Sequence, residues 1–459
     1  MSFTSLAFYA WLSGSVVVYR RLPARFRGVA LVVLSCAFCG YASPLALGLL
    51  LVATLIAWFS GVRLAAETDE KKRTRVLTGA IVVMIGMLVA FKAAGVLRGV
   101  LIPLGLSYYT FKLTSYVLET YWDPSYAEPK LVRLAAYATF GAQLVSGPIQ
   151  RPRSFFEQLD ATRDLDADFE KGFRLILHGL FLKLVIGDRL GTFTDMVAKA
   201  PETYSRNVLG IAAFSYLPQL YADFAGYTNI ALGVGLLFGI EGPPNFDAPF
   251  SAPNIQDYWR RWHISLTTWL GDYVFTPLRM ATRNLGKVGL VASVLVNMTL
   301  IGVWHGFTLC FVVFGLLNGI FLAVSVLTLK QRQKFFGRYK SLTSVRMVLG
   351  IVIVQSLLAL TQIFFQAPTV GSALAFLEIV IGVKAAGAGT LATIRTDVSD
   401  PILVCWLIAF YAGLGMPGTK RLRETVTRWV PNWVRYGIAL LALSALTLEA
   451  GGKFIYGQF

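Results

Sequence analysis

Long apolar runs separated by short charged loops recur along the chain. The longest, Val291–Leu327, is mostly apolar and has one titratable side chain, His305, between Trp304 and Gly306. Because a membrane span needs roughly 20 apolar residues, this run predicts two spans that form a helical hairpin with Gly306 near its turn. His305 is therefore expected within or near the membrane.

Further apolar runs predict additional spans or short membrane helices. They lie at Ser5–Tyr19, 28–42, 44–66, 76–92, Leu106–Tyr121, 131–147, Phe173–Leu190, Pro218–Gly239, 344–366, 370–383, 401–415 and 434–450. The fold class is an all-α polytopic membrane protein with about ten to thirteen spans. The first run lacks a small-residue cleavage site, so it is interpreted as a span and not as a cleaved signal peptide.

Polar residues interrupt some of these runs. Leu106–Tyr121 contains hydroxyl and charged side chains that must face protein or water, because lipid satisfies none of them. Gly147 and two prolines end any helix that begins near residue 131. The mixed stretch Asp160–Lys171 is expected to form a surface loop or an interfacial helix.

The segment Asn245–Leu278 is rich in tryptophan and charge. Asn254 is expected to cap a helix whose first turn carries Asp257. At 100° per residue one face would hold Trp259, Trp262, His263, Leu266, Trp269, Leu270 and Tyr273. Such a helix should lie at the interface or re-enter the membrane, either as a structural anchor or as a channel wall that brings His263 towards His305.

Composition and charge agree with a membrane protein. Of 459 residues, 56% are hydrophobic and 15% charged, whereas soluble domains carry about a quarter charged residues. The net charge of +17 sits mainly in four basic clusters, at Arg20–Arg27, Lys71–Arg75, Lys330–Lys340 and Lys420–Arg423. The positive-inside rule predicts that all four are cytoplasmic and that the N-terminus is outside. Basic residues spread over separate loops argue against nucleic-acid binding.

Few residues in the sequence are candidates for catalysis or metal binding. His305 is either functional or a neutral imidazole that bridges two helices, and His178 is interpreted as a packing residue. Asp223 is expected to pair with a buried Lys or Arg. Cys36 and Cys39 are interpreted as small hydrophobic residues, and no metal-ligand spacing, phosphate loop or nucleophile elbow is present. A membrane histidine suits acyl transfer, as general base towards a hydroxyl, or a proton-coupled transporter or flippase; the residues alone leave both open.

A set of motifs in fixed order then favours one of these two. They are 105–111 (GLSYYTF), 147–149 (GPI), Lys183 with Asp188-Arg189, 221–227 (YADFAGY), Asn245-Phe246 to Pro249-Phe250, 259–266 (WRRWHISL), 302–306 (GVWHG) and 364–368 (FFQAP). With these motifs the chain resembles the membrane-bound O-acyltransferase family, in particular its bacterial branch of D-alanine transfer proteins and alginate O-acetyltransferases. The resemblance covers most of the chain from about residue 30 to 380.

The resemblance implies a fold, a domain layout and a site. The fold would be a ring of helices with re-entrant or interfacial helices around a central funnel that narrows to a tunnel. Residues 1–459 would form one transmembrane acyltransferase domain, with scaffold helices at 1–100, a motif-bearing core at 101–330 and C-terminal helices at 331–459. His305 would be catalytic, with His263 as second histidine and, in supporting positions, Trp259, Arg260, Trp262, Trp304, Asp223, Tyr227, Asn245 and Asn254.

The resemblance also implies the substrates. No bound cofactor or metal is expected; the donor would be a thioester, on the phosphopantetheine of an acidic acyl carrier protein or on coenzyme A, drawn to the basic cytoplasmic face. The acceptor would be a hydroxyl of an envelope polymer such as teichoic acid or an exopolysaccharide, or a lipid-linked one, outside a bacterial inner membrane whose lipids surround the chain.

Two departures from the family pattern bear on specificity. The Gly-Gly-Asn-Arg element typical of the alginate branch is absent from Pro277–Asn284, which favours D-alanyl over acetyl as the acyl group. Gln366 stands where the family commonly has arginine in F-F-R-A. If that arginine pairs with a carboxylate, the pair is missing here.

Overall fold

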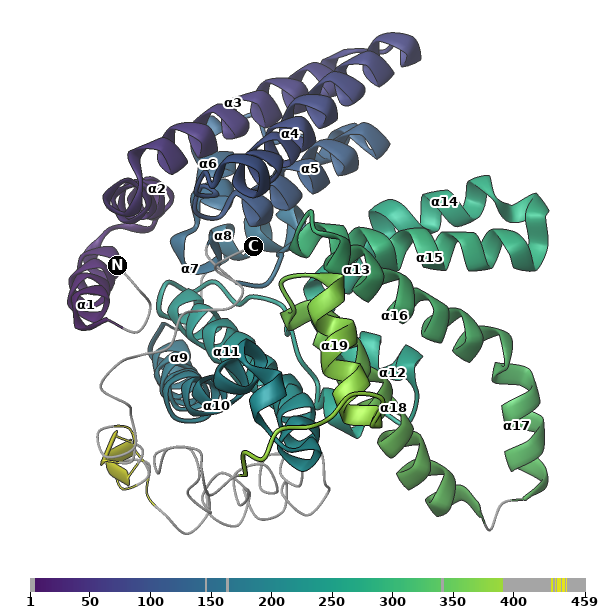
Figure 1. Ribbon diagram of the computed structural model, residues 1–459. Coiled ribbons are helices and arrows are strands. Elements are labelled where there is room, and N and C mark those ends of the chain that lie inside the picture. Colours follow the sequence, from purple (N-terminus) through teal and green to yellow (C-terminus); the bar gives the residue numbers. More distant parts are fainter. Residues whose placement is uncertain are drawn as a thin grey trace. The chain divides into compact units, whose positions relative to one another are not determined.

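The computed structural model describes residues 5–144, 147–161, 165–339 and 342–390, and scattered positions between 431 and 443. These residues form the α-helices α1 to α19 and contain no β-strand (Figure 1). Six helices of the described part are long and apolar enough to cross a membrane: α2 (Ala24–Ala42), α3 (Pro44–Ala66), α4 (Glu70–Arg98), α15 (Gly286–His305), α16 (Leu309–Leu327) and α18 (Thr343–Gln366). The chain is therefore an all-α polytopic membrane protein, as the hydrophobic pattern predicts.

The predicted hairpin at Val291–Leu327 is confirmed, because α15 ends at His305 and α16 begins at Leu309. Two shorter runs form shorter helices, α1 (Leu6–Arg21) of 16 residues and α19 (Val370–Ile381) of 12. The spans predicted at 401–415 and 434–450 lie outside the described residues, apart from isolated positions in the second.

The chain divides into two compact units. One contains the residues up to Leu180 together with Tyr227–Pro243, and the other contains Phe181–Gly226 together with the described residues from Pro244 onward. Besides α1 to α4, the first unit holds α5 (Leu106–Trp122), α6 (Leu131–Thr139), α7 (Gly141–Leu144), α8 (Pro152–Asp160) and α9 (Leu165–Leu180). The second holds α10 (Asp188–Lys199), α12 (Ile255–Arg261), α13 (Ile264–Leu270), α14 (Thr276–Ala281), α15, α16, α17 (Leu329–Arg338), α18 and α19, and α11 (Arg206–Leu237) contributes to both.

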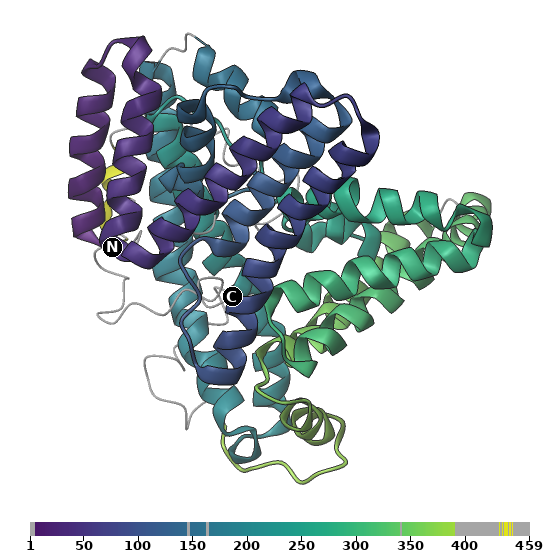
Figure 2. The same cartoon turned by 90° about the horizontal axis from the view of Figure 1, so that it is seen from above.

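In the first unit, α3, α4 and α5 run side by side (Figures 1 and 2). Ser43 ends α2 and caps α3, accepting from the Ala46 backbone N–H at 3.2 Å, with Pro44 at the first helical position. These two residues explain why the apolar sequence from 28 to 66 forms two helices and not one.

The polar helix α5 is buried in protein, as its composition predicts. Lys112 is 2% exposed and donates to the Tyr137 carbonyl at 2.6 Å and to Gln143 Oε1 at 3.0 Å. Its ammonium also lies 4.4 Å from the centroid of the Tyr137 ring. Backbone and amide acceptors therefore replace the water that a buried cation loses.

One predicted span is interrupted. Phe173–Leu190 forms the end of α9, a π-helical segment at Phe181–Gly187 and the start of α10. Residues five apart diverge on an α-helix but lie on nearly the same face of a π-helix, so this segment brings Lys183 and Asp188 together. Their side-chain atoms Nζ and Oδ1 are 2.6 Å apart.

Candidate active site

The tryptophan-rich segment forms two short helices, α12 and α13, so the prediction of one continuous amphipathic helix is wrong. The predicted cap is present, since the Asp257 backbone N–H donates to Asn254 Oδ1 at 2.9 Å. The helix then stops because Trp262 is extended and pairs with Phe246 in an antiparallel bridge. This pairing turns the chain at His263.

His263 has a left-handed backbone conformation, with φ 46° and ψ 52°. For a residue with a Cβ this conformation is unfavourable by about 1–2 kcal/mol. Hydrogen bonds on both sides hold it: Asp247 N–H donates to the Arg261 carbonyl and Ile264 N–H to the Asn245 carbonyl, both at 2.9 Å. A strained backbone held in place by its surroundings is typical of functional sites.

The side chain of Asn245 fixes the tautomer of His263. Asn245 Oδ1 accepts from the Ser265 backbone N–H at 3.2 Å and from Ser265 Oγ at 2.8 Å, so it is an acceptor oxygen. His263 Nδ1 lies 3.1 Å from the same oxygen and must therefore be the protonated, donating nitrogen. In the neutral ring the lone pair is then on Nε2.

Burial keeps His263 neutral. Its exposed fraction is 1%, and this burial lowers the pKa of the imidazole to about 3. Its position at the N-terminus of α13 acts in the same direction, because the helix dipole disfavours a positive charge there. The ring packs edge-on against Phe224, with centroids 4.7 Å apart.

Trp304 lies between the two histidines. Its ring centroid is 5.8 Å from that of His263 and 4.7 Å from that of His305. The structure thus brings His263 and His305 into contact with the same indole ring.

His305 is enclosed by aromatic rings and is 4% exposed. Phe365 of α18 packs against it edge-on, with centroids 4.9 Å apart, while Phe311 and Phe314 of α16 lie at 6.3 Å. Three helices therefore supply one apolar cage for one imidazole. Such a cage strengthens electrostatic interactions inside it, because water is excluded.

Two glycines allow α15 and α16 to pack this closely. A Cβ on Gly302 would lie 2.1 Å from the Phe311 carbonyl oxygen, and one on Gly306 would lie 2.3 Å from the Phe311 ring. Any other residue would therefore push Phe311 away from His305. This contact explains why glycine follows the histidine in the W-H-G motif.

A buried ionic triad lies in the same unit. Lys183 Nζ is 2.6 Å from Asp188 Oδ1 and 2.6 Å from Asp223 Oδ1, and the side chains of all three are at most 3% exposed. The expected pairing of Asp223 with a buried cation is confirmed. Phe224, the next residue after Asp223, packs against the His263 ring. By fixing Asp223, the triad therefore helps to hold the residue that contacts His263.

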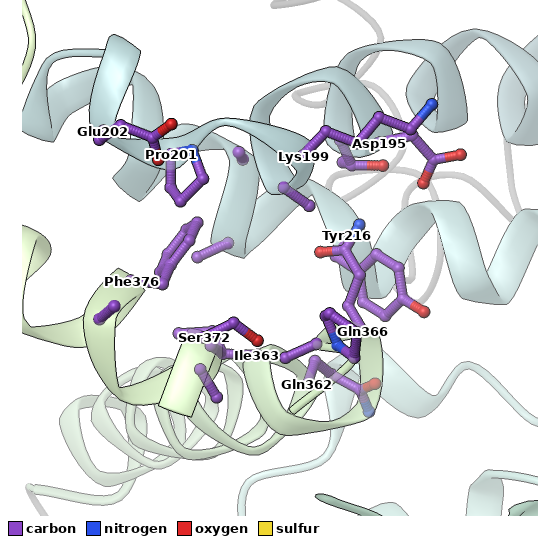
Figure 3. A pocket seen from close by; sticks show the side chains of 18 residues that line it. Asp195, Lys199, Pro201, Glu202, Tyr216, Gln362, Ile363, Gln366, Ser372 and Phe376 are labelled. Atoms are coloured by element: carbon purple, nitrogen blue, oxygen red, sulfur yellow. The ribbon is translucent and has the colours of Figure 1, made fainter. Parts of the chain in front are cut away.

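A cavity of about 650 Å³ lies between α10, α11, α18 and α19 (Figure 3). Asp195, Tyr216 and Gln366 gather on one side of it, with Pro201 and Phe376 on the other. Phe365 links the cavity wall to His305: its ring centroid is 6.5 Å from that of Tyr216, which lines the cavity, and 4.9 Å from that of His305.

Gln366, which stands in place of arginine, lies on the cavity wall together with Asp195 and Lys199. Its buried amide nitrogen makes no hydrogen bond to any of the described residues. Desolvation raises the pKa of Asp195 in spite of both neighbours. An arginine at position 366 would be placed to pair with the Asp195 carboxylate. Sequence reasoning missed Asp195 because none of the motifs contains it.

The remaining predicted residues have varied positions. Trp259 and Trp262 are buried around Tyr258, whose ring stacks on that of Trp262 at 5.6 Å. Arg260 is exposed. Tyr227 and His178 belong to the other unit, where the exposed His178 has its Nδ1 3.1 Å from Asn229 Nδ2.

Residues 126–363 fit the model of MBOAT, the membrane-bound O-acyltransferase family. The matched region contains the triad, His263, Trp304, His305 and the two α16 rings of the cage, and it ends two residues before Phe365.

Individual similar proteins also have the names of acyltransferases. A probable alginate O-acetylase of Azotobacter vinelandii is 32% identical over 71% of this chain and 68% of its own length. A peptidoglycan O-acetyltransferase of Helicobacter pylori is 30% identical over 62% of this chain and 58% of its own. A teichoic acid D-alanyltransferase of Bacillus subtilis is 34% identical over 54% of this chain and 65% of its own length. The chain thus spans about two thirds of the length of such relatives.

Proposed function

The chain belongs to the membrane-bound O-acyltransferase family, and we propose that it transfers an acyl group from a cytoplasmic thioester to a hydroxyl of a cell-envelope polymer. The observation that supports this most strongly is the arrangement of His305, Trp304 and His263 in one apolar cluster. The names of the relatives support the class of acceptor, because each denotes the acylation of an envelope polymer.

His305 would act as the general base. Its imidazole takes the proton of the acceptor hydroxyl while that oxygen attacks the thioester carbonyl. Collapse of the tetrahedral intermediate breaks the C–S bond, and the leaving thiolate takes the proton from the imidazolium to give the free thiol. The surrounding Phe365, Phe311 and Phe314 exclude water and so protect the thioester from hydrolysis.

His263 would act through Trp304. Asn245 fixes the orientation of its ring, that ring contacts the indole, and the indole contacts His305. We assign it as a positioning residue for the base. The resemblance also placed it near the reaction centre, and this chain of contacts supports that placement.

Helix lengths suggest how the two substrates approach. With 24 residues at 1.5 Å each, α18 is about 36 Å long, enough to cross the roughly 30 Å core of a bilayer. It starts beside the basic helix α17, which the positive-inside rule puts in the cytoplasm, and ends at Gln366 on the 650 Å³ cavity. The donor would then enter at the α17 end, and the acceptor would enter through the cavity.

We expect the protein to bind no cofactor other than the thioester that donates the acyl group. An acidic acyl carrier protein or coenzyme A would be attracted to the basic residues of α17 and of Lys71–Arg75 at the start of α4, which the positive-inside rule puts in the cytoplasm. The sequence motifs and the relatives favour different acyl groups. The motifs favour D-alanyl, whereas the match to the O-acetylase covers 71% of the chain against 54% for the D-alanyltransferase. We therefore propose acetyl.

The test is the release of ester-linked groups by mild base from cells that lack the protein, complemented with wild type or His305→Ala. Only wild type should restore a released acid, and the acid should be acetate. Release of D-alanine would reassign the acyl group. Equal restoration by His305→Ala, at equal protein levels in the membrane, would contradict a catalytic His305. Substrate flux in proteoliposomes without an ester product would favour a transporter.

A further inference from the structure

A second cavity, of about 490 Å³, lies between the C-terminal half of α16, α17 and the N-terminal half of α18. The lining side chains of each long helix recur every three or four residues, so each helix presents one face to it. They are Phe321, Val324 and Ser325 on α16, Thr328 directly after it, and Val345, Arg346, Leu349, Gly350, Ile353, Val354 and Leu357 on α18. We call this cavity the α16–α18 groove.

The groove is apolar along its length and basic at one end. Arg332 of α17 and Arg346 of α18 both line it, and none of its described lining residues is acidic. Arg332 donates to the Ser325 carbonyl at 2.6 Å, but its buried Nε has no hydrogen-bond partner among the described residues. The Arg346 guanidinium lies over the Phe336 ring, 4.9 Å from its centroid.

The positive charges of Arg332 and Arg346 repel each other. Burial and the neighbouring Arg346 both lower the pKa of Arg332. An anion between the two guanidiniums would remove this repulsion and supply an acceptor for the buried Nε. The basic end of the groove therefore suits a phosphate.

The length of the groove distinguishes between phosphate-bearing ligands. From Arg346 to Leu357 is 11 residues, or about 16 Å, close to the thickness of one leaflet of a bilayer with a roughly 30 Å core. The acyl donor would have to reach His305, whose contact Phe365 lies a further eight residues, about 12 Å, along α18. The lined groove ends before that point, which favours a lipid over the donor.

We propose that the α16–α18 groove binds one anionic phospholipid, with its phosphate between Arg332 and Arg346 and one acyl chain against the faces of α16 and α18. Pro253, Asn254 and Ile255 also line the groove. Because Asn254 caps α12, the helix that leads to His263, the bound lipid stabilises the segment that carries the histidine cluster. This proposal concerns binding and stability and does not depend on the acyl-transfer reaction.

The experiment is thermal unfolding of the purified full chain in detergent with dioctanoyl phosphatidylglycerol or dioctanoyl phosphatidylcholine. Saturating phosphatidylglycerol should raise the Tm of wild type by roughly 5 °C, and phosphatidylcholine by much less. The double variant Arg332→Gln/Arg346→Gln should need at least tenfold more phosphatidylglycerol for a half-maximal shift.

The matched control is Lys334→Gln/Arg338→Gln, which removes the same charge from α17 at positions outside the lining. It should respond like wild type. A second variant, Ile353→Trp, fills the groove without changing charge and should also lose the response, so the test stands even if the arginine variant does not fold. An unchanged response in both groove variants, or stabilisation by coenzyme A but not by phosphatidylglycerol, would overturn the proposal.

Discussion

Replacing Asn245 by alanine tests whether the orientation of His263 matters for the reaction. The Asn245 oxygen accepts three hydrogen bonds, from His263 Nδ1 at 3.1 Å, from the Ser265 backbone N–H at 3.2 Å and from Ser265 Oγ at 2.8 Å. The hydroxyl can turn to another acceptor, but the other two donors are left buried, at about 1–3 kcal/mol each. We expect Asn245→Ala to lower the free energy of unfolding by about 2–6 kcal/mol.

The loss in rate should exceed what stability explains. An imidazole without its Nδ1 hydrogen bond can rotate, and a displacement of about 1 Å passed through Trp304 to the base is enough to lower a rate by up to about 100-fold. We expect base-released ester per unit of membrane protein to fall about tenfold, with the KM for the donor unchanged. Acyl transfer and thermal unfolding are measured on the same preparation.

Ser265→Ala is the matched control, because it removes a hydrogen bond to the same Asn245 oxygen and leaves that of His263 in place. It should lower stability by about 1 kcal/mol and the rate by less than about twofold. If Ser265→Ala lowers the rate as much as Asn245→Ala, or if Asn245→Ala keeps the full rate, the positioning role of His263 is refuted.

Three further predictions follow from the site. Gly306→Ala should strongly reduce acyl transfer while the protein remains in the membrane, because its Cβ would lie 2.3 Å from the Phe311 ring; full activity would contradict the role of that contact. Lys183→Met should lower the amount of folded protein more than Asp223→Asn, since it leaves two buried carboxylates without their cation, a loss of about 3–5 kcal/mol; quantification of folded protein by size-exclusion chromatography tests the order. Asp195→Asn should raise Tm at pH 8 and not at pH 4, because a carboxyl with a raised pKa favours the folded state only while protonated; a pH-independent Tm difference would contradict this.

The hydrophobic pattern alone determines the class of fold. Runs of roughly 20 apolar residues can be accommodated only as spans, so α2, α3, α4, the α15–α16 hairpin and α18 follow directly from the sequence. The polar face of α5 and the cap at Asn254 also follow, because buried polar groups and helix ends require partners. His305 could be chosen for the same reason, as a costly ionisable group in an apolar run.

Only the tertiary structure decided how the site is built. Helical periodicity places Trp262 and His263 on the face of one helix, but the bridge from Phe246 competes for the same backbone groups and breaks that helix. The π-helical turn that pairs Lys183 with Asp188 has no simple periodic signal.

The neighbours of Gln366 and His305 come from distant parts of the chain. Asp195 precedes Gln366 by 171 residues, and Phe365 and Phe311 reach His305 from two other helices. Local sequence specifies which residues must avoid lipid, because that depends on each side chain and its near neighbours. Which residues then meet depends on the packing of whole helices, and only the folded chain contains that information.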